Sequence, residues 1–144
     1  MIRVLLADDH EVIRFGLRLL INATKDLELV GSAADGMEAV SMALRESPDV
    51  VVMDLSMPRL NGIEATVEIK RERPQTRVLV LTSYTYDPIV RDAIKAGASG
   101  YLLKDERAPK VIEAIRAVHR GEQPMAPSLT RSRGWWPDPA GSPG

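Results

Sequence analysis

The chain has 144 residues, no cysteine, and 20 acidic against 19 basic side chains, which leaves a formal net charge of −1. This length suits one domain with one buried core, and the missing cysteines exclude disulfides and thiolate metal sites. Basic residues scattered among acids predict no nucleic-acid-binding surface, and the absence of a long apolar run predicts a cytoplasmic protein without a membrane span or signal sequence.

Short apolar, β-branched runs recur along the chain, and each is too short for a helix. They predict strands at residues 2–7, 27–33, 50–53, 77–81 and 100–103. Stretches whose apolar residues have helical spacing, such as Ile13, Leu17 and Leu20, lie between and after these runs and predict five helices.

Proline and glycine mark where several of these helices begin and end. Ser47-Pro48 and Arg73-Pro74 are expected to stop helices, because proline cannot continue one. In Asp87-Pro88 we expect Asp87 to be an N-cap and Pro88 the first helical residue, and Gly97 suits a left-handed C-terminal cap.

Strict alternation of apolar strands and helices predicts a doubly wound α/β fold. In such a fold a parallel sheet is covered by helices on both faces and its crossovers are right-handed. Ligands bind outside the carboxyl ends of the strands. The polar residues at these ends are Asp8, Asp9, Asp54, Thr82 and Lys104, so we expect the chemistry there.

Three carboxylates at one sheet edge would repel each other unless a cation neutralises them. Oxygen ligands without cysteine or clustered histidine favour a hard octahedral cation, Mg2+, with Mn2+ as the alternative. We expect Asp9 and Asp54 to be direct ligands and Asp8 to act through a bound water. The backbone carbonyl of Ser56 is a further candidate ligand.

Asp54 is the candidate nucleophile. A carboxylate at a strand end can attack phosphorus to form an acyl phosphate, and a bound cation and Lys104 would favour its ionised form. The Lys104 ammonium would also hold the phosphoryl oxygens, and the Thr82 hydroxyl can donate one hydrogen bond to them.

Motifs at and near the strand ends resemble the receiver domain of two-component response regulators over about residues 1–120. They are residues 6–10 (LADDH), residues 51–58 (VVMDLSMP), Gly62, Thr82-Ser83 and residues 100–104 (GYLLK). This resemblance implies a flavodoxin-like and CheY-like fold, in which five helices surround a five-stranded parallel sheet of strand order 2-1-3-4-5.

The resemblance also implies partners and a switch. Asp54 would take a phosphoryl group from a phosphohistidine on a sensor histidine kinase, and Thr82 and Tyr101 would form the switch pair. Dimers linked to phosphorylation would use the face of the fourth helix, fifth strand and fifth helix, or the first and last helices. The competing interpretation of Tyr101 is an ordinary packed tyrosine without a switching role.

Lys104 is followed by Asp105, where many receivers have proline, and residues 102–105 (LLKD) resemble the NarL/FixJ group, which carries a LuxR-type helix-turn-helix output domain. We therefore expect a receiver at 1–120 and a linker at 121–144, whose part 131–144 looks non-native. The output domain is absent from this sequence, so DNA would be bound only through that missing domain.

Two other functions compete with the receiver. A metal-dependent phosphohydrolase is disfavoured because the Asp-x-Asp pattern of such enzymes and a cap insertion are missing, since Leu55-Ser56 follows Asp54. A degenerate adaptor should lack Asp9, Asp54 or Lys104, and all three are present. His10 follows the acidic pair, and we expect it to start the first helix at the mouth of the site rather than to bind metal.

Overall fold

The structure is a computed structural model that describes residues 1–129. One parallel sheet has the order β2-β1-β3-β4-β5. Its strands are β1 (Ile2–Ala7), β2 (Leu27–Ala33), β3 (Val50–Met53), β4 (Arg77–Thr82) and β5 (Gly100–Leu103). The helices are α1 (Glu11–Asn22), α2 (Gly36–Glu46), α3 (Gly62–Glu72), α4 (Asp87–Lys95), α5 (Ala108–His119) and the short 3-10 helix η1 (Pro127–Leu129). The predicted fold class and strand order are confirmed.

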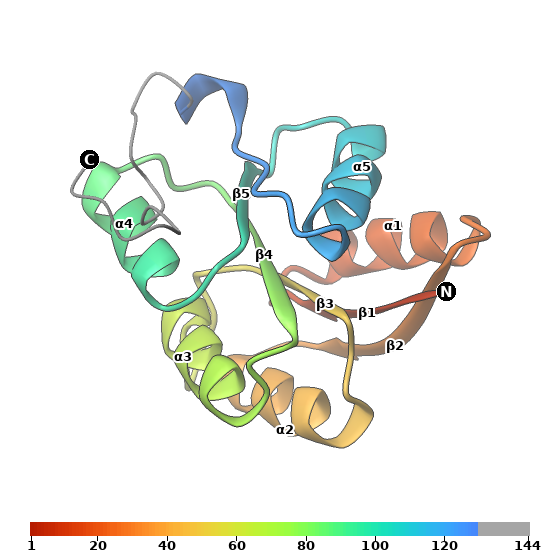
Figure 1. Cartoon of the computed structure of the whole chain (residues 1–144), viewed down its shortest axis with the longest axis horizontal. Helices are drawn as coiled ribbons and strands as arrows, with labels where there is room; N and C mark the ends of the chain where they lie inside the picture. The colour runs from red at the N-terminus through yellow and green to blue at the C-terminus, as the bar shows by residue number, and fades with distance from the viewer. Residues whose placement is uncertain (130–144) are drawn as a thin grey trace.

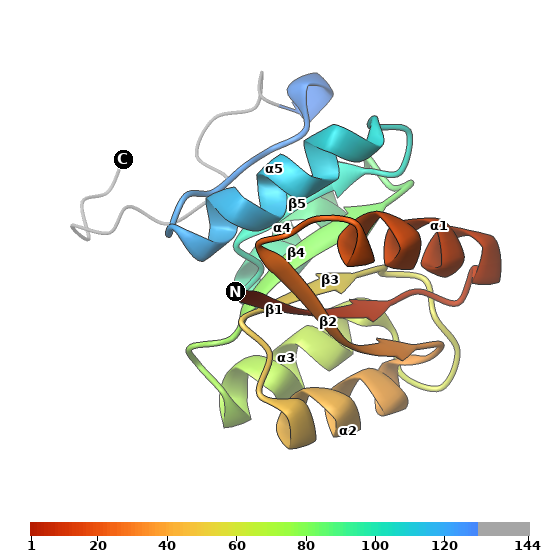
Figure 2. The ribbon, with the colours of Figure 1, turned by 90° about the vertical axis from the view of Figure 1, so that its right-hand side faces the viewer.

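Helices cover both faces of the sheet. Figures 1 and 2 show α1 and α5 on one face and α2, α3 and α4 on the other. In β1, Val4 and Leu6 belong to the core under α1 and α5, whereas Leu5 and Ala7 belong to the core under the other three helices. Because side chains alternate along a strand, burial of both faces explains why the strands are almost wholly apolar.

The helix boundaries agree with the predicted stops, with one correction. α2 ends before Ser47, whose φ is 51°, and Gly97 after α4 has a φ of 114°, so both adopt the left-handed conformation. Asp87 is not the N-cap of α4 but its first residue. The Tyr86 carbonyl accepts hydrogen bonds from the N–H groups of Ile89 and Val90, which makes Tyr86 the cap.

The chain continues to pack after α5, inside the segment that the sequence predicts as a linker. It turns at Gly121 and returns beside β5 to η1, burying Ala126 and Leu129. In Figures 1 and 2 this blue segment runs along the edge of β5. The predicted non-native part, residues 131–144, lies outside the described residues.

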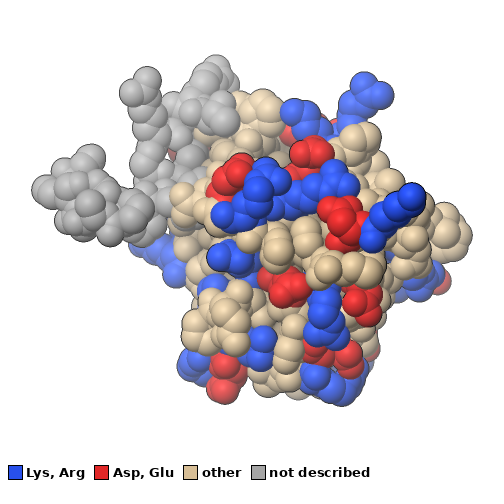
Figure 3. All heavy atoms as spheres, turned by 45° about the vertical axis from the view of Figure 1, so that its right-hand side comes forward, with Lys and Arg blue, Asp and Glu red and all other residues tan. Residues whose placement is uncertain are grey.

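Surface charge is mixed in sign. On the face drawn in Figure 3, Lys and Arg side chains alternate with Asp and Glu, and no stripe of one sign crosses it. Within residues 1–129 the longest helices have 12 residues, and no helix is long and apolar enough to cross a membrane.

Candidate functional site

The candidate residues lie together because each follows, or ends, a parallel strand. The hydrogen-bonded ladder continues one residue past three of the strands. The Asp8 N–H donates to the Ala33 carbonyl at 3.0 Å, the Asp54 N–H to the Ala7 carbonyl at 2.8 Å, and the Lys104 N–H to Thr82 at 2.9 Å. The backbone of the sheet therefore fixes the positions of both acids and the lysine.

Asp8 and Asp54 form a buried pair of acids joined by one lysine. Their residues are only 4% and 2% exposed. The Lys104 ammonium lies 3.0 Å from Asp8 Oδ2 and 3.1 Å from Asp54 Oδ2, so a single cation bridges the two carboxylates. At this depth each charge needs a partner, because water cannot solvate it.

Asp54 is the least satisfied acid of the pair. Its Oδ2 is buried and accepts no hydrogen bond of good geometry from the described residues, although the Lys104 ammonium faces it as an ion pair. Burial raises the pKa of the Asp54 carboxyl, and the nearby Asp8 carboxylate raises it further, whereas Lys104 acts in the opposite direction. An added cation beside Asp54 would stabilise its ionised form.

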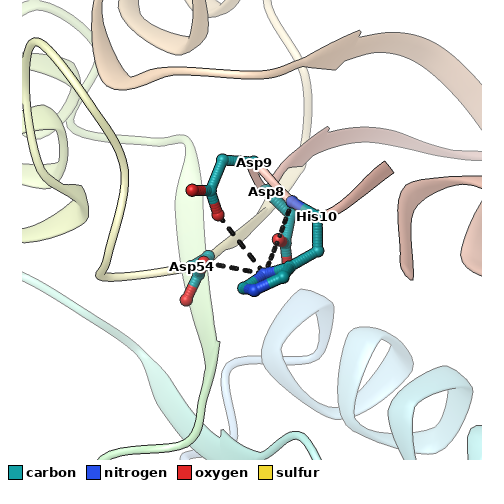
Figure 4. Close-up of side chains that lie close together, drawn as sticks. All are labelled: Asp8, Asp9, His10 and Asp54. Carbon is teal, nitrogen blue, oxygen red and sulfur yellow. Dashed lines mark hydrogen bonds and ion pairs between the residues drawn. The ribbon is translucent and has the colours of Figure 1, made fainter. Parts of the chain in front are cut away.

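The His10 ring reaches into this group of acids from the start of α1. Its Nδ1 atom lies 2.9 Å from Asp8 Oδ1, 3.3 Å from Asp9 Oδ1 and 3.9 Å from Asp54 Oδ2. Figure 4 shows the ring between the three carboxylates. His10 is the N-cap of α1, as its expected place at the helix start requires, but sequence reasoning missed how far its ring reaches inward.

The His10 ring also meets Lys104, whose Nζ lies 3.0 Å from Nδ1. One ring nitrogen cannot donate to Asp8 and accept from Lys104 at the same time, so these two contacts are alternatives set by the position of one proton. In either arrangement Asp8 Oδ1 keeps the hydrogen bond from the His10 backbone N–H at 2.8 Å.

The donor set fits a hard divalent cation. Asp8, Asp9, His10 and Asp54 can each offer one ligand atom, and these atoms lie within 4.8 Å of one another. Three of them are carboxylates, the ligands that Mg2+ and Mn2+ prefer, and the buried Oδ2 of Asp54 has unused capacity. The Ser56 N–H donates to Asp54 Oδ1 at 3.5 Å, which holds Ser56 beside the acid, while its carbonyl as a ligand stays a prediction.

A glycine allows α3 to begin directly against the backbone of Asp54 and Leu55. A Cβ atom at Gly62 would lie 2.0 Å from the backbone oxygen of Asp54, far inside van der Waals contact. The Gly62 N–H donates to the Leu55 carbonyl at 2.9 Å. The first turn of α3 is thus tied to the backbone of Asp54 and Leu55.

Thr82 and Tyr101 are both fully buried, and both contact the backbone of Tyr84. The Tyr84 N–H donates to Thr82 Oγ1 at 3.5 Å, and the Tyr101 hydroxyl donates to the Tyr84 carbonyl at 2.8 Å. Burial raises the pKa of the Tyr101 hydroxyl, so it remains a hydrogen-bond donor. One residue of the loop after β4 therefore joins the two predicted switch residues.

Comparisons with known proteins show the family to which this chain belongs. Residues 4–116 match the family model described as the response regulator receiver domain. The transcriptional regulatory protein LiaR of Bacillus subtilis is 49% identical over 122 residues, which cover 85% of this chain and 58% of LiaR. The response regulator protein VraR of Staphylococcus aureus is 41% identical over 128 residues, covering 89% of this chain and 61% of VraR. The chain thus spans less than two thirds of either relative.

Solved structures share the fold. A LuxR-family two-component response regulator from Aurantimonas has a TM-score of 0.84 and 36% identity, over 90% of this chain and 92% of the other. The response regulator domain of Thermotoga maritima CheB has a TM-score of 0.78 and 37% identity, over 83% of this chain and 97% of the other. This chain therefore belongs to the response regulator receiver domain family, among receivers of the NarL/LuxR type.

Proposed function

We propose that Asp54 is the phosphoryl acceptor of a switch driven by a sensor histidine kinase. The observation that carries this proposal is the buried Asp54 carboxylate, which has an unsatisfied oxygen and faces the Lys104 ammonium at 3.1 Å. A nucleophile for phosphorus needs an ionised oxygen and nearby positive charge for the transferred group. Lys104 is the nearby positive charge, and a bound divalent cation would keep the Asp54 oxygen ionised.

Asp8, Asp9 and Asp54, with the Ser56 backbone carbonyl, would hold Mg2+ or Mn2+. When bound, the cation supplies positive charge that keeps Asp54 ionised and offsets the charge of a phosphoryl group. Asp9 is the more exposed of the adjacent acids, which suits direct access from solvent, whereas Asp8 is already paired with Lys104. Asp8 would act through a bound water.

The phosphoryl transfer needs little from the protein beyond the correct placement of the reacting groups. An ionised Asp54 oxygen forms a bond to phosphorus while the bond from phosphorus to the histidine nitrogen of the kinase breaks. The nitrogen keeps that electron pair and takes up a proton. The Asp54 carboxylate thereby becomes an acyl phosphate. Lys104 would turn from the carboxylate to the new phosphoryl oxygens, and the Thr82 hydroxyl would donate to one of them.

Switching would pass from Thr82 to Tyr101 through the loop after β4. If Thr82 moves toward the phosphoryl group, its contact with the Tyr84 N–H is lost, and the loop to which the Tyr101 hydroxyl is bonded can shift. The surface of α4, β5 and α5 would change as a result. The domain would act on its own acyl phosphate only, and not on separate substrates.

The relatives suggest how this receiver works in a longer protein. We place the receiver at residues 1–120 and a linker at 121–144, ahead of a LuxR-type DNA-binding output domain, in a cytoplasmic transcription regulator. Support comes from the similarity to LiaR and to LuxR-family structures. DNA would be contacted only by that output domain, which fits the mixed charge on the face in Figure 3.

A partner face on α1 is supported by an exposed apolar stripe. Val12, Phe15 and Leu19 are 83%, 53% and 56% exposed, and their spacing places them on one side of the helix. Dimerisation linked to phosphorylation through α1 and α5, or through the α4-β5-α5 face, predicts a change in sedimentation when a phosphoryl mimic binds. An unchanged mass would contradict it.

Intact mass after incubation with acetyl phosphate tests the proposed function. We expect wild type to gain one phosphoryl group only when Mg2+ is present, and Asp54→Asn to gain none. Asp105→Asn is the matched control, because Asp105 is an exposed acid directly after Lys104. Equal labelling of wild type and Asp54→Asn would contradict the proposal.

A further inference from the structure

The edge of β5 carries an unexpected strand-like partner. β5 is the last strand of the sheet, so one row of its backbone groups faces outward. The Tyr101 N–H donates to the Pro124 carbonyl at 2.9 Å, and the Ala126 N–H donates to the Tyr101 carbonyl at 2.8 Å. Tyr101 and Met125 thus form a parallel bridge, the geometry by which an extended peptide adds to a sheet edge.

Residues 124–129, here called the docking segment, also bury apolar side chains. Ala126 is 0% exposed and Leu129 is 6% exposed, and both belong to the same buried cluster as Tyr101. Ser128, between them in sequence, is exposed. A Cβ atom at Gly100 would lie 3.0 Å from Pro124, so the glycine lets the segment approach the strand closely.

Tyr101 connects the docking segment to the phosphoryl site. Its backbone is hydrogen-bonded to the segment, and its hydroxyl is bonded to the Tyr84 carbonyl, whose N–H contacts Thr82. Tyr101 lies on an edge strand, yet it is 0% exposed, because the docking segment adds cover beyond the edge. The docking segment therefore belongs to the same core in which the Tyr101 ring is buried.

We propose that the docking segment is a built-in ligand of the β5 edge, and that phosphorylation at Asp54 tightens its binding through Tyr101. This coupling rests on the proposed function. The phosphoryl group would draw Thr82 away and favour the inward Tyr101 ring, and the inward ring is the one that the segment covers. Coupling between two sites is reciprocal, so a seated segment also favours the phosphorylated state.

A seated docking segment limits which partners can reach the outer edge of β5. A partner that needs the outer edge of β5 must compete with Pro124 and Ala126 for the Tyr101 backbone. Seating of the docking segment also fixes the position of Leu129, the last residue that the structure describes. Phosphorylation would thus hold residues 124–129 on the receiver rather than release them.

Amide hydrogen exchange of the full chain, without phosphorylation, tests the docking. Leu129→Asp places a charge in a buried position, and we expect it to speed exchange at Tyr101 and Ala126 by about tenfold or more. Ser128→Asp adds the same charge to an exposed position of the same segment and should leave both rates as in wild type. Equal rates in the two variants would overturn the docking.

Exchange with and without Mg2+ and beryllofluoride, a phosphoryl mimic, tests the coupling. We expect exchange at Ala126 to slow about fivefold or more in wild type, and to slow much less in Thr82→Ala. Unchanged or faster exchange in a chain that has bound the mimic would overturn the coupling. A chain that accepts no phosphoryl group by mass would refute the proposed function and the coupling with it, whereas the first experiment would still decide the docking.

Discussion

The floor and the mouth of the acidic site are built differently. At the floor, the side chains of Asp8 and Asp54 are 6% and 2% exposed and their backbones continue the strand ladder. At the mouth, the side chains of Asp9 and His10 are 36% and 58% exposed and their positions depend on side-chain rotamers. Sheet geometry therefore fixes the position of Asp54, whereas the side chains of Asp9 and His10 can adapt.

The largest expected effect comes from removing the Lys104 ammonium, which lies between the two acids of the floor. Lys104→Ala should slow phosphoryl transfer from acetyl phosphate to Asp54 by about 100-fold or more, because we propose that the Lys104 ammonium, 3.1 Å from Asp54 Oδ2, holds the transferred group. The rate is measured by intact mass over time. Lys25→Ala, at an exposed lysine, is the control and should react like wild type. A loss below about threefold would show that the floor does not need this charge.

Alanine substitutions at two glycines distinguish the close contact at Asp54 from ordinary helix propensity. Gly62→Ala should lower the free energy of unfolding by about 3 kcal/mol, because the new Cβ would lie 2.0 Å from the Asp54 carbonyl oxygen. Gly16→Ala, within α1, meets nothing within 4 Å and should raise stability by about 0.5–1 kcal/mol. Urea unfolding measures both. The same sign for both variants would refute the close contact at Gly62.

The buried acid predicts a pH dependence of stability. The pKa of Asp54 is raised in the folded state above its ordinary 3.8, so the folded protein holds this proton more firmly than the unfolded chain. The resulting stabilisation is present below pH 3.8 and is lost as the pH rises through the folded-state pKa.

Asp54→Asn removes this titration, so it should be more stable than wild type at pH 7 when no divalent cation is present. The difference should shrink as the pH falls toward 3.8, because protonation then makes Asp54 neutral as well. Urea unfolding of both proteins across this range measures it. A difference that does not change with pH would contradict the raised pKa.

The smallest effect is expected at the mouth. The His10 ring lies among the carboxylates that would bind Mg2+, so His10→Ala should remove a competitor and lower the Kd for Mg2+ by about two- to tenfold, the equivalent of one hydrogen bond. Calorimetric titration measures the Kd. His119→Ala, at the end of α5, is the control. Weaker Mg2+ binding in His10→Ala would instead make His10 a ligand.

The sequence predicts the floor well and the periphery less well, for physical reasons. Alternating burial makes strands visible in the sequence, and the observed β4 differs from its predicted range only by including Thr82, which pairs with Leu103. The inward His10 ring could not be read from spacing, although three consecutive polar residues after a strand were a signal.

The docking segment could not be predicted from the sequence, for a different reason. It is seated by two backbone hydrogen bonds and by the burial of Ala126 and Leu129, so it has neither helical nor strand periodicity. Backbone hydrogen bonds do not require particular side chains, so they leave no periodic pattern in the sequence. A proline-rich stretch instead predicts a linker. Only the three-dimensional position of β5 at the sheet edge makes the pairing apparent.

The most direct measurement of the central claim locates the phosphoryl group within wild-type protein. After reaction with acetyl phosphate and Mg2+, trypsin would cleave after Arg3, Arg14, Arg45 and Arg59, so Asp54 and the Asp8-Asp9 pair fall in separate fragments. We predict the added phosphoryl mass on the fragment 46–59 that contains Asp54. Phosphoryl mass on the fragment 4–14, or on neither fragment of a labelled chain, would contradict Asp54 as the acceptor.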